Sequence, residues 1–209
     1  MSWPFATKEL WEMYGYKGFG ETPVLRDVLY EEDGPIARVI LNRPEKRNAI
    51  RRAEGEWEIA AALQLATAND AIKVIILKGN GPCFSAGHDI SAEPHVEGTV
   101  APGNRRGWQH MEKNEFETAL MQSPWSCPKP VIAQVHSHCL AAASSLVLAC
   151  DVVICSDDAQ FGHPAQRGNG PHENAGIWVW SLGIQWAKRL LLTGDLIDAQ
   201  TALRIGWET

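Results

Sequence analysis

The sequence predicts an α/β protein, because stretches with the character of buried strands alternate with stretches of helical periodicity over most of the chain. The clearest strand is a nearly continuous apolar run at residues 72–77, and residues 131–135 and 152–154 have the same character. Helical spacing of apolar residues marks residues 53–68, and an Ala- and Leu-rich stretch at residues 140–149 predicts a buried helix.

The remaining elements follow in chain order. Two short β-branched runs, residues 24–30 and 36–41, flank Glu-Glu-Asp-Gly, and this punctuation predicts a hairpin. A long helix is expected at residues 177–192, where Thr-Gly-Asp follows it, and another at residues 199–204. In the helix at residues 53–68, the apolar face is expected to consist of Trp57, Ala61, Leu65 and Ala68.

The length of 209 residues predicts one domain with an appendage. Residues 1–22 are expected to form an N-terminal extension, and residues 23–209 the domain itself. Within the domain, residues 91–126 begin without a regular pattern and end with helical spacing. A connection of this length in a compact domain is typically functional, so we expect it to cover the active site.

Composition limits the class of protein. The chain is 45% hydrophobic and 21% charged, as in globular proteins, and its net charge of −6 without a long basic run disfavours nucleic acid or an anionic membrane as a partner. No apolar stretch is long enough to span a bilayer, and the N-terminus lacks the pattern of a secretory signal. Five cysteines without a CxxC pair argue against a disulfide framework or a zinc site, so a reducing, cytoplasmic location is expected.

Several motifs follow one another in a recognisable order. Leu-Asn-Arg-Pro-Glu-Lys-Arg-Asn-Ala-Ile occupies residues 41–50, and Phe-Ser-Ala-Gly-His-Asp-Ile occupies residues 84–90. Lys-Pro-Val-Ile-Ala-Gln-Val begins at residue 129, Ser-Asp-Asp-Ala-Gln-Phe-Gly ends at residue 162, and Leu-Thr-Gly-Asp ends at residue 195. Together they resemble the crotonase (enoyl-CoA hydratase/isomerase) superfamily over roughly residues 24–207. The resemblance implies a crotonase-like ββα spiral core with flanking helices. In this chain we expect the C-terminal helical part of that fold to be short or missing.

The resemblance implies a shared chemistry, in which two backbone N–H groups stabilise a thioester enolate in an oxyanion hole. One donor would be His88, between Gly and Asp of the Ala-Gly-x-Asp motif. The other would be Ala142, in a turn that opens a helix and reads Leu-Ala-Ala-Ala-Ser-Ser where the family has glycines. An alternative explanation is that these alanines only pack the helix.

Two positions depart from the family. Hydratases that the chain resembles carry a glutamate just after the glycine-rich turn and another after Phe-Gly-x-Pro, and here these positions read Ser145 and Ala165. Neither is a carboxylate, so addition of water by two glutamates is not expected. Ser145 is a candidate for holding a water molecule, although a buried helical serine more often bonds to the preceding turn.

Other residues are candidates for moving a proton. Glu173 follows Gly-Asn-Gly-Pro-His and precedes the long helix, where a carboxylate serves either catalysis or the helix N-terminus. His163, in Phe-Gly-His-Pro, is the next candidate because histidine titrates near neutrality. His136 and His138 would share one face of a strand, but no third metal ligand is evident, so no metal is expected.

The His88 side chain is expected near the thioester, where it either orients substrate or points to solvent. The resemblance also implies that CoA and the substrate contact the first two motifs, and the candidate residues there are Lys46, Arg47, Ala49, Ala86, Asp89 and Ile90.

Taken together, we expect an enoyl-CoA hydratase/isomerase-like lyase of fatty acid metabolism, without a cofactor because coenzyme A is part of the acyl-CoA substrate. The alternatives are a CoA-thioester or C–C bond hydrolase that uses Glu173 or a histidine, and a non-catalytic acyl-CoA binder. The family resemblance further implies a homotrimer or homohexamer.

Overall fold

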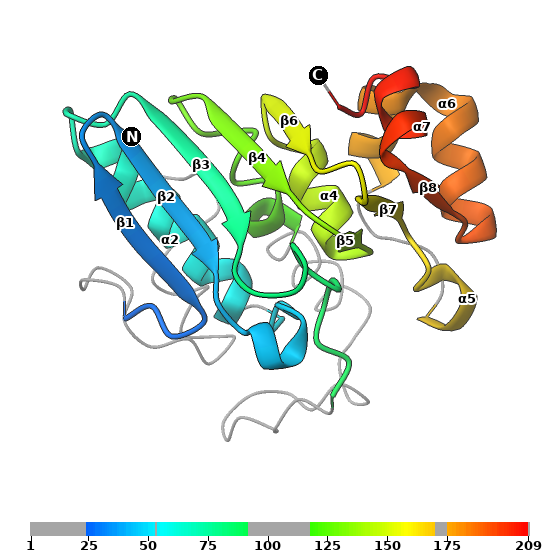
Figure 1. Ribbon diagram of the computed structural model, residues 1–209, viewed down its shortest axis with the longest axis horizontal. Coiled ribbons are helices and arrows are strands. Elements are labelled where there is room, and N and C mark those ends of the chain that lie inside the picture. The colour runs from blue at the N-terminus through cyan, green and yellow to red at the C-terminus, as the bar shows by residue number, and fades with distance from the viewer. Residues whose placement is uncertain (1–23, 53, 92–117, 170–174, 209) are drawn as a thin grey trace, which may run out of the picture.

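The computed structural model describes residues 24–52, 54–91, 118–169 and 175–208. Strands and helices alternate along most of this part of the chain, which confirms the α/β class (Figure 1). The strands are β1 (Val28–Asp33), β2 (Ile36–Leu41), β3 (Val74–Gly79), β4 (Val131–Val135), β5 (His138–Leu140), β6 (Val152–Cys155), β7 (Gln160–Gly162) and β8 (Leu196–Asp198). The helices are η1 (Pro44–Lys46), α2 (Glu54–Ala68), α4 (Ala142–Leu148), α5 (Gln166–Asn169), α6 (Ala175–Thr193) and α7 (Ala199–Arg204).

The larger sheet has the strand order β1-β2-β3-β4-β6. β1 and β2 form an antiparallel hairpin, in which Val28 lies opposite Leu41, and the other strands run parallel to β2. The smaller sheet has the order β5-β7-β8, with β5 and β7 parallel and β8 antiparallel to β7. β5 follows β4 after a two-residue turn, so one chain segment connects the two sheets.

The core lies between the larger sheet and its helices. α2 and α4 lie behind this sheet in Figure 1, and α6 and α7 gather with β8 at one end of the molecule. Ile59 of α2, Ile75 and Leu77 of β3 and Leu146 of α4 are all completely buried within one hydrophobic cluster. The transfer of such apolar side chains out of water is the main force that holds these layers together.

The structure confirms several elements and corrects others. The strand at residues 131–135 and the helix at residues 199–204 are where the sequence predicts them. The predicted hairpin forms, but its first strand is Val28–Asp33 and not residues 24–30, so most of the predicted turn belongs to the strand. In β3, however, Ile75 and Leu77 are buried while Val74 and Ile76 are half-exposed, so helices cover this strand on one face and not on both.

The apolar face predicted for α2 was wrong except at Ala61, which is buried. Trp57 and Leu65 are only half-buried and Ala68 is exposed. The buried face instead includes two glutamates, which a pattern of apolar residues assigns to solvent. It consists of Gly55, Glu56, Glu58, Ile59, Ala60, Ala61, Ala62, Leu63 and Ala66.

The helix expected at residues 140–149 begins only at Ala142, because β5 occupies the residues just before it. Residues 1–22 lie outside the described residues, and so does most of the predicted cover at residues 91–126, of which residues 118–121 are helical. Among the helices that are described, none combines the length and the apolar character needed to cross a membrane.

Candidate active site

Residues 84–89 lie between β5 on one side and residue 50 on the other. The N–H of Leu140 donates to the carbonyl oxygen of Ser85 at 3.0 Å. On the opposite side, the N–H of Ile50 donates to Gly87 and the N–H of Asp89 donates to Ile50, both at 2.8 Å. Backbone hydrogen bonds therefore hold the Ala-Gly-His-Asp motif from both sides.

Gly87 allows this motif to approach the start of α4. Its φ is +94°, and a Cβ atom there would lie 2.7 Å from the oxygen of Leu140 and 2.8 Å from the Cβ of Ala141. The same Cβ position is 3.2 Å from the backbone nitrogen of Ala142. A side chain at residue 87 would therefore separate two backbones that now lie in direct contact.

Ser144 secures the start of α4 from the other side. Its hydroxyl lies 2.7 Å from the carbonyl oxygen of Cys139 and 3.0 Å from that of Gly162, and accepts the N–H of Gly162 at 3.3 Å. The N–H of Ala141 donates to the oxygen of Gly162 at 2.8 Å. These hydrogen bonds thus connect the first turn of α4 to β5 and β7.

Two backbone N–H groups, those of His88 and Ala142, belong to the two segments that meet where the Ala-Gly-His-Asp motif approaches α4. In the part of the chain that the structure describes, neither the N–H of His88 nor that of Ala142 has a hydrogen-bond acceptor. Ala142 is the first residue of α4, where an N–H has no partner within the helix. Two such donors on adjacent backbones are suited to bind one oxygen atom that carries negative charge.

Near these donors, neither position where the family resemblance implies a glutamate can transfer a proton as a carboxylate does. Ser145 is buried, and its hydroxyl accepts a hydrogen bond of 2.8 Å from the indole nitrogen of Trp178. Ala165 is half-buried and has no polar side-chain atom. The indole donor therefore already engages the hydroxyl of Ser145.

His163 is buried next to the same tryptophan. Its ring lies edge-on to Trp178, with centroids 6.1 Å apart. Burial lowers the pKa of His163, and the nearby His88 lowers it further. The imidazole is therefore neutral at physiological pH, since its ordinary pKa is already near 6.5.

The side chain of His88 reaches α2. Its Nε2 lies 2.6 Å from Oε1 of Glu56, a side chain that is 0% exposed, while the His88 side chain is 15% exposed. Glu56 was not among the candidates from the sequence, because a glutamate in a helix with mixed periodicity is normally assigned to the solvent face.

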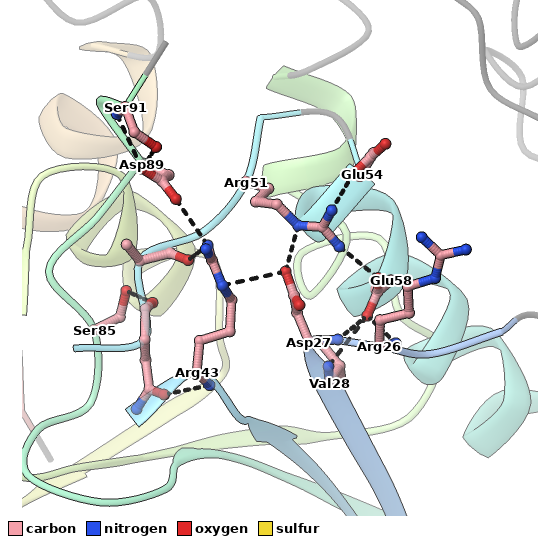
Figure 2. Close-up of polar contacts among 12 residues, drawn as sticks. Arg26, Asp27, Val28, Arg43, Arg51, Glu54, Glu58, Ser85, Asp89 and Ser91 are labelled. Atoms are coloured by element: carbon pink, nitrogen blue, oxygen red, sulfur yellow. Dashed lines mark hydrogen bonds and ion pairs between the residues drawn. The ribbon is translucent and has the colours of Figure 1, made fainter. Parts of the chain in front are cut away.

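Arg43 ties the motif to the edge of the larger sheet, as Figure 2 shows. Its guanidinium lies 3.0 Å from the carboxylate of Asp89 and 3.6 Å from that of Asp27. Asp27 also accepts a 2.6 Å bond from Arg51, which lies 3.6 Å from Glu58. Alternating charges thus connect residue 89 to α2 through two arginines.

The carboxyl groups at the two ends of this network, Asp89 and Glu58, have pKa values that are shifted in opposite directions. Hydrogen bonds from the hydroxyl and N–H of Ser91, together with the charge of Arg43, lower the pKa of Asp89 to about 2. Burial raises the pKa of Glu58, although Oε2 of Glu58 accepts three N–H groups, from residues 26–28, at 2.7–3.1 Å. The sequence analysis did not identify Glu58 either.

The candidate CoA-binding residues come together along one side of the motif. The N–H of Ala86 donates to the oxygen of Arg47 at 3.0 Å, and the oxygen of Ala49 accepts a 2.7 Å bond from Arg43. Lys46 and Arg47 are exposed. Ile90, beside Asp89, is 83% exposed.

The remaining candidates are less informative. Glu173 lies outside the described residues. His136 and His138 do not share a strand face, because the turn at Ser137 (φ 52°) separates β4 from β5. Within the described ranges, no group of three or more His, Cys, Asp or Glu side chains is arranged to hold a metal ion.

Residues 31–207 match the model of the enoyl-CoA hydratase/isomerase family. The chain belongs to that family. Its crotonase fold is shared with solved structures of the enoyl-CoA hydratase/isomerase family. The enoyl-CoA hydratase of Mycobacterium smegmatis is 32% identical, with a TM-score of 0.77, and the match covers 89% of this chain and 67% of that one. An enoyl-CoA hydratase/isomerase from Xanthobacter autotrophicus Py2 is 34% identical, with a TM-score of 0.76 and coverage of 88% and 66%.

Curated relatives of this enoyl-CoA hydratase/isomerase family member carry similar names. The putative enoyl-CoA hydratase EchA13 of Mycobacterium tuberculosis is 33% identical over 198 residues, which cover 84% of this chain and 59% of the relative. A putative enoyl-CoA hydratase of Thermus thermophilus is 32% identical, with coverage of 84% and 67%. The chain therefore spans about six-tenths of the length of the first of these relatives.

Proposed function

We propose that this chain binds an acyl-CoA thioester and stabilises its enolate, with the carbonyl oxygen between the N–H groups of His88 and Ala142. The observation that best supports this proposal is the pair of N–H groups without acceptors among the described residues, on backbones that Gly87 brings into contact. Negative charge grows on the oxygen as the enolate forms, so fixed donors stabilise the transition state more than the bound thioester.

The reaction we propose is proton transfer next to the thioester carbonyl, as in an enoyl-CoA isomerase, and no cofactor is needed for it. Ser145 is bonded to Trp178, and Ala165 carries no acid or base. Each missing proton-transfer group lowers a rate by about 10²–10⁴-fold. Hydration of crotonyl-CoA should therefore be slow compared with that by a two-glutamate hydratase.

The test of the oxyanion hole is Ala142→Pro. Proline lacks an N–H, and it is tolerated at the first position of a helix, which Ala142 occupies. Two hydrogen bonds to the carbonyl of bound butyryl-CoA should lower its stretching frequency in a Raman difference spectrum. We expect Ala142→Pro to bind butyryl-CoA but to lose most of this frequency shift, and to lower any turnover by about 10²–10³-fold.

Ala142→Gly is the matched control, because it changes the side chain and keeps the N–H. It should retain the wild-type frequency shift, and thermal unfolding of both variants reports whether the fold is intact. A wild-type frequency shift in folded Ala142→Pro would contradict the proposal, as would failure of the wild-type protein to bind butyryl-CoA.

A second candidate function is non-catalytic binding of acyl-CoA, which the engaged hydroxyl of Ser145 favours. Binding without turnover across a panel of acyl-CoA thioesters would support the binder. Hydrolysis of a CoA thioester or C–C bond, with Glu173 or His163 as the base, stays an alternative; release of free CoA from the same panel would identify thioester hydrolysis.

We also propose that the chain assembles into a homotrimer or homohexamer. The support is an apolar surface on α6, where Val179, Trp180 and Ile184 are exposed and Trp125 packs edge-on against Trp180. Exposed apolar side chains that gather on one surface typically form interfaces between proteins.

A further inference from the structure

Glu56 and His88 form a pair that the chemistry described so far does not use. Glu56 lies in the first turn of α2, and the N-terminus of a helix favours a carboxylate there. That preference does not require burial, however, and this carboxylate is completely buried with His88 Nε2 at 2.6 Å. Because an isolated buried carboxylate is strongly unfavourable, the bond to His88 helps to compensate for placing it there.

The hydrogen bond selects which ring nitrogen of His88 is available. A carboxylate accepts a hydrogen bond from Nε2–H, and in a neutral imidazole that carries its proton on Nε2 the other nitrogen, Nδ1, has a free lone pair. Among the described residues, Nδ1 of His88 has no hydrogen-bond partner. Nδ1 is also the ring nitrogen closer to the backbone, and therefore to the N–H that would bind the thioester oxygen.

We propose that the His88 imidazole is the base that removes the Cα proton of the bound thioester, with Glu56 as the residue that orients the imidazole and stabilises its protonated form. This proposal rests on the oxyanion hole proposed above. The C–H bond at Cα breaks, its proton joins Nδ1, and its electron pair forms the C=C bond of the enolate while the carbonyl π pair moves to oxygen. The imidazolium returns the proton to Cα or, in a β,γ-unsaturated thioester, to Cγ.

The surroundings of His88 support this assignment. The backbone donor and the proposed base belong to the same residue. The thioester oxygen and its Cα are only two bonds apart, so His88 can serve both, the N–H as donor to the oxygen and the imidazole as base for Cα. Among the described residues, Glu56 from α2 contacts the ring and His163, just after β7, interacts with it electrostatically, while the next residue, Asp89, is paired with Arg43. Glu56 is the carboxylate in direct contact, so its charge stabilises the imidazolium formed in the reaction.

The experiment measures deuterium uptake at Cα of vinylacetyl-CoA in deuterated water, together with its conversion to crotonyl-CoA. His88→Gln retains the backbone N–H, and its amide can donate to Glu56, but it has no basic nitrogen. We expect it to lower Cα exchange by about 10²-fold or more while the affinity for butyryl-CoA stays within a few-fold.

Glu56→Gln tests the role of Glu56. Its readout is the pH dependence of the exchange rate, which would not change if Glu56 only supported the fold. Removal of the negative charge should destabilise the imidazolium that forms when His88 takes up the Cα proton. The acid limb of the exchange rate against pH should therefore move to lower pH, with a rate loss of about tenfold or more. NMR titration of the His88 ring in the ligand-free protein should show the same direction.

Glu58→Gln is the matched control, because it removes another buried carboxylate from the same helix, one that faces Arg51 and the N–H groups of residues 26–28. It should leave the acid limb of the pH profile in place. Wild-type exchange in His88→Gln would overturn the proposal, and loss of exchange in Glu173→Gln but not in His88→Gln would assign the base to Glu173.

Two negative results would distinguish the proposal of His88 as base from the proposal of the oxyanion hole on which it rests. If the wild-type protein binds butyryl-CoA with a lowered carbonyl frequency but exchanges no deuterium, His88 is not a base and the oxyanion hole remains supported. If it binds no butyryl-CoA, both proposals are wrong, because the base then has no thioester to act on.

Discussion

Ala141 has φ 53° and ψ −121°, a backbone conformation that L residues rarely adopt. Strain of this kind amounts to roughly 1–3 kcal/mol and persists only where surrounding contacts hold it in place. Here the contacts are the bond from the N–H of Ala141 to Gly162 and the hydroxyl of Ser144. At the scale of single residues, this strained turn lets α4 begin beside Gly87 with an N–H that has no acceptor among the described residues.

Replacement of Ala141 by glycine should relieve this strain. Glycine adopts positive φ without steric cost, so we expect Ala141→Gly to raise the free energy of unfolding by about 1 kcal/mol. Denaturant unfolding of the two proteins measures the difference directly.

Ala143→Gly is the control for that measurement. Ala143 lies inside α4 with helical backbone, so glycine there should lower the free energy of unfolding by about 1 kcal/mol. A loss of stability in both variants would show that the turn at Ala141 is not strained.

At the scale of elements, the ion-pair network joins three segments that the sequence separates. Asp89 belongs to the motif after β3, Arg43 precedes η1, and Glu58 lies in α2 (Figure 2). Buried or half-buried ion pairs keep a fixed geometry when several hydrogen bonds satisfy them, as in this network. The network therefore links the segment that carries Asp89 to the start of β1 and to α2.

The lowered pKa of Asp89 predicts how acid weakens this attachment. The folded-state pKa of about 2 lies below the ordinary value of 3.8, so ionised Asp89 stabilises the fold above about pH 4. This contribution should disappear as the pH falls from about 4 to about 2. The free energy of unfolding of the wild-type protein should therefore approach that of Asp89→Asn over this range.

Asp195 serves as a comparison, because its partner Arg167 is 64% exposed and the pair is therefore screened by solvent. Asp195→Asn should follow the wild-type pH dependence closely. A constant gap between wild type and Asp89→Asn from pH 6 to 2 would contradict the predicted acid dependence.

At the scale of the whole molecule, α6 carries both buried and exposed side chains, and it is kinked at Gly183 (φ 74°) where the sequence predicts an unbroken helix. Trp178, Leu182 and Leu190 are buried, whereas Trp180 is 78% exposed on the same helix. Such a large exposed aromatic residue is typical of an interface anchor.

Trp180→Glu should weaken the proposed self-association. Removal of an aromatic anchor costs about 2 kcal/mol or more at an interface, which corresponds to roughly 30-fold weaker association. Sedimentation velocity over a range of protein concentrations would show a smaller average mass for this variant. Ile154→Glu, at an exposed position on β6, should leave the mass unchanged, and equal masses for wild type and Trp180→Glu would exclude α6 as the interface.

Local patterns in the sequence predicted most of the elements. The hairpin, β4 and α7 follow from turn residues, apolar runs and helix signals that act over a few residues, such as Asp198, which caps α7 by accepting the N–H of Thr201 at 2.8 Å. The motifs also placed His88, Ala142 and the residues around Lys46 as candidates, and the structure brings the segments that carry them together.

The sequence by itself determined the α/β class and the order of the motifs, because periodicity and turn chemistry are properties of neighbouring residues. Only the tertiary structure decided that Glu56 is buried against His88 and that Trp178 engages Ser145. These pairs are 32 and 33 residues apart, and no local pattern specifies either contact. Their side chains are polar, so only the packing of α2, α4 and α6 determines whether they meet water or one another.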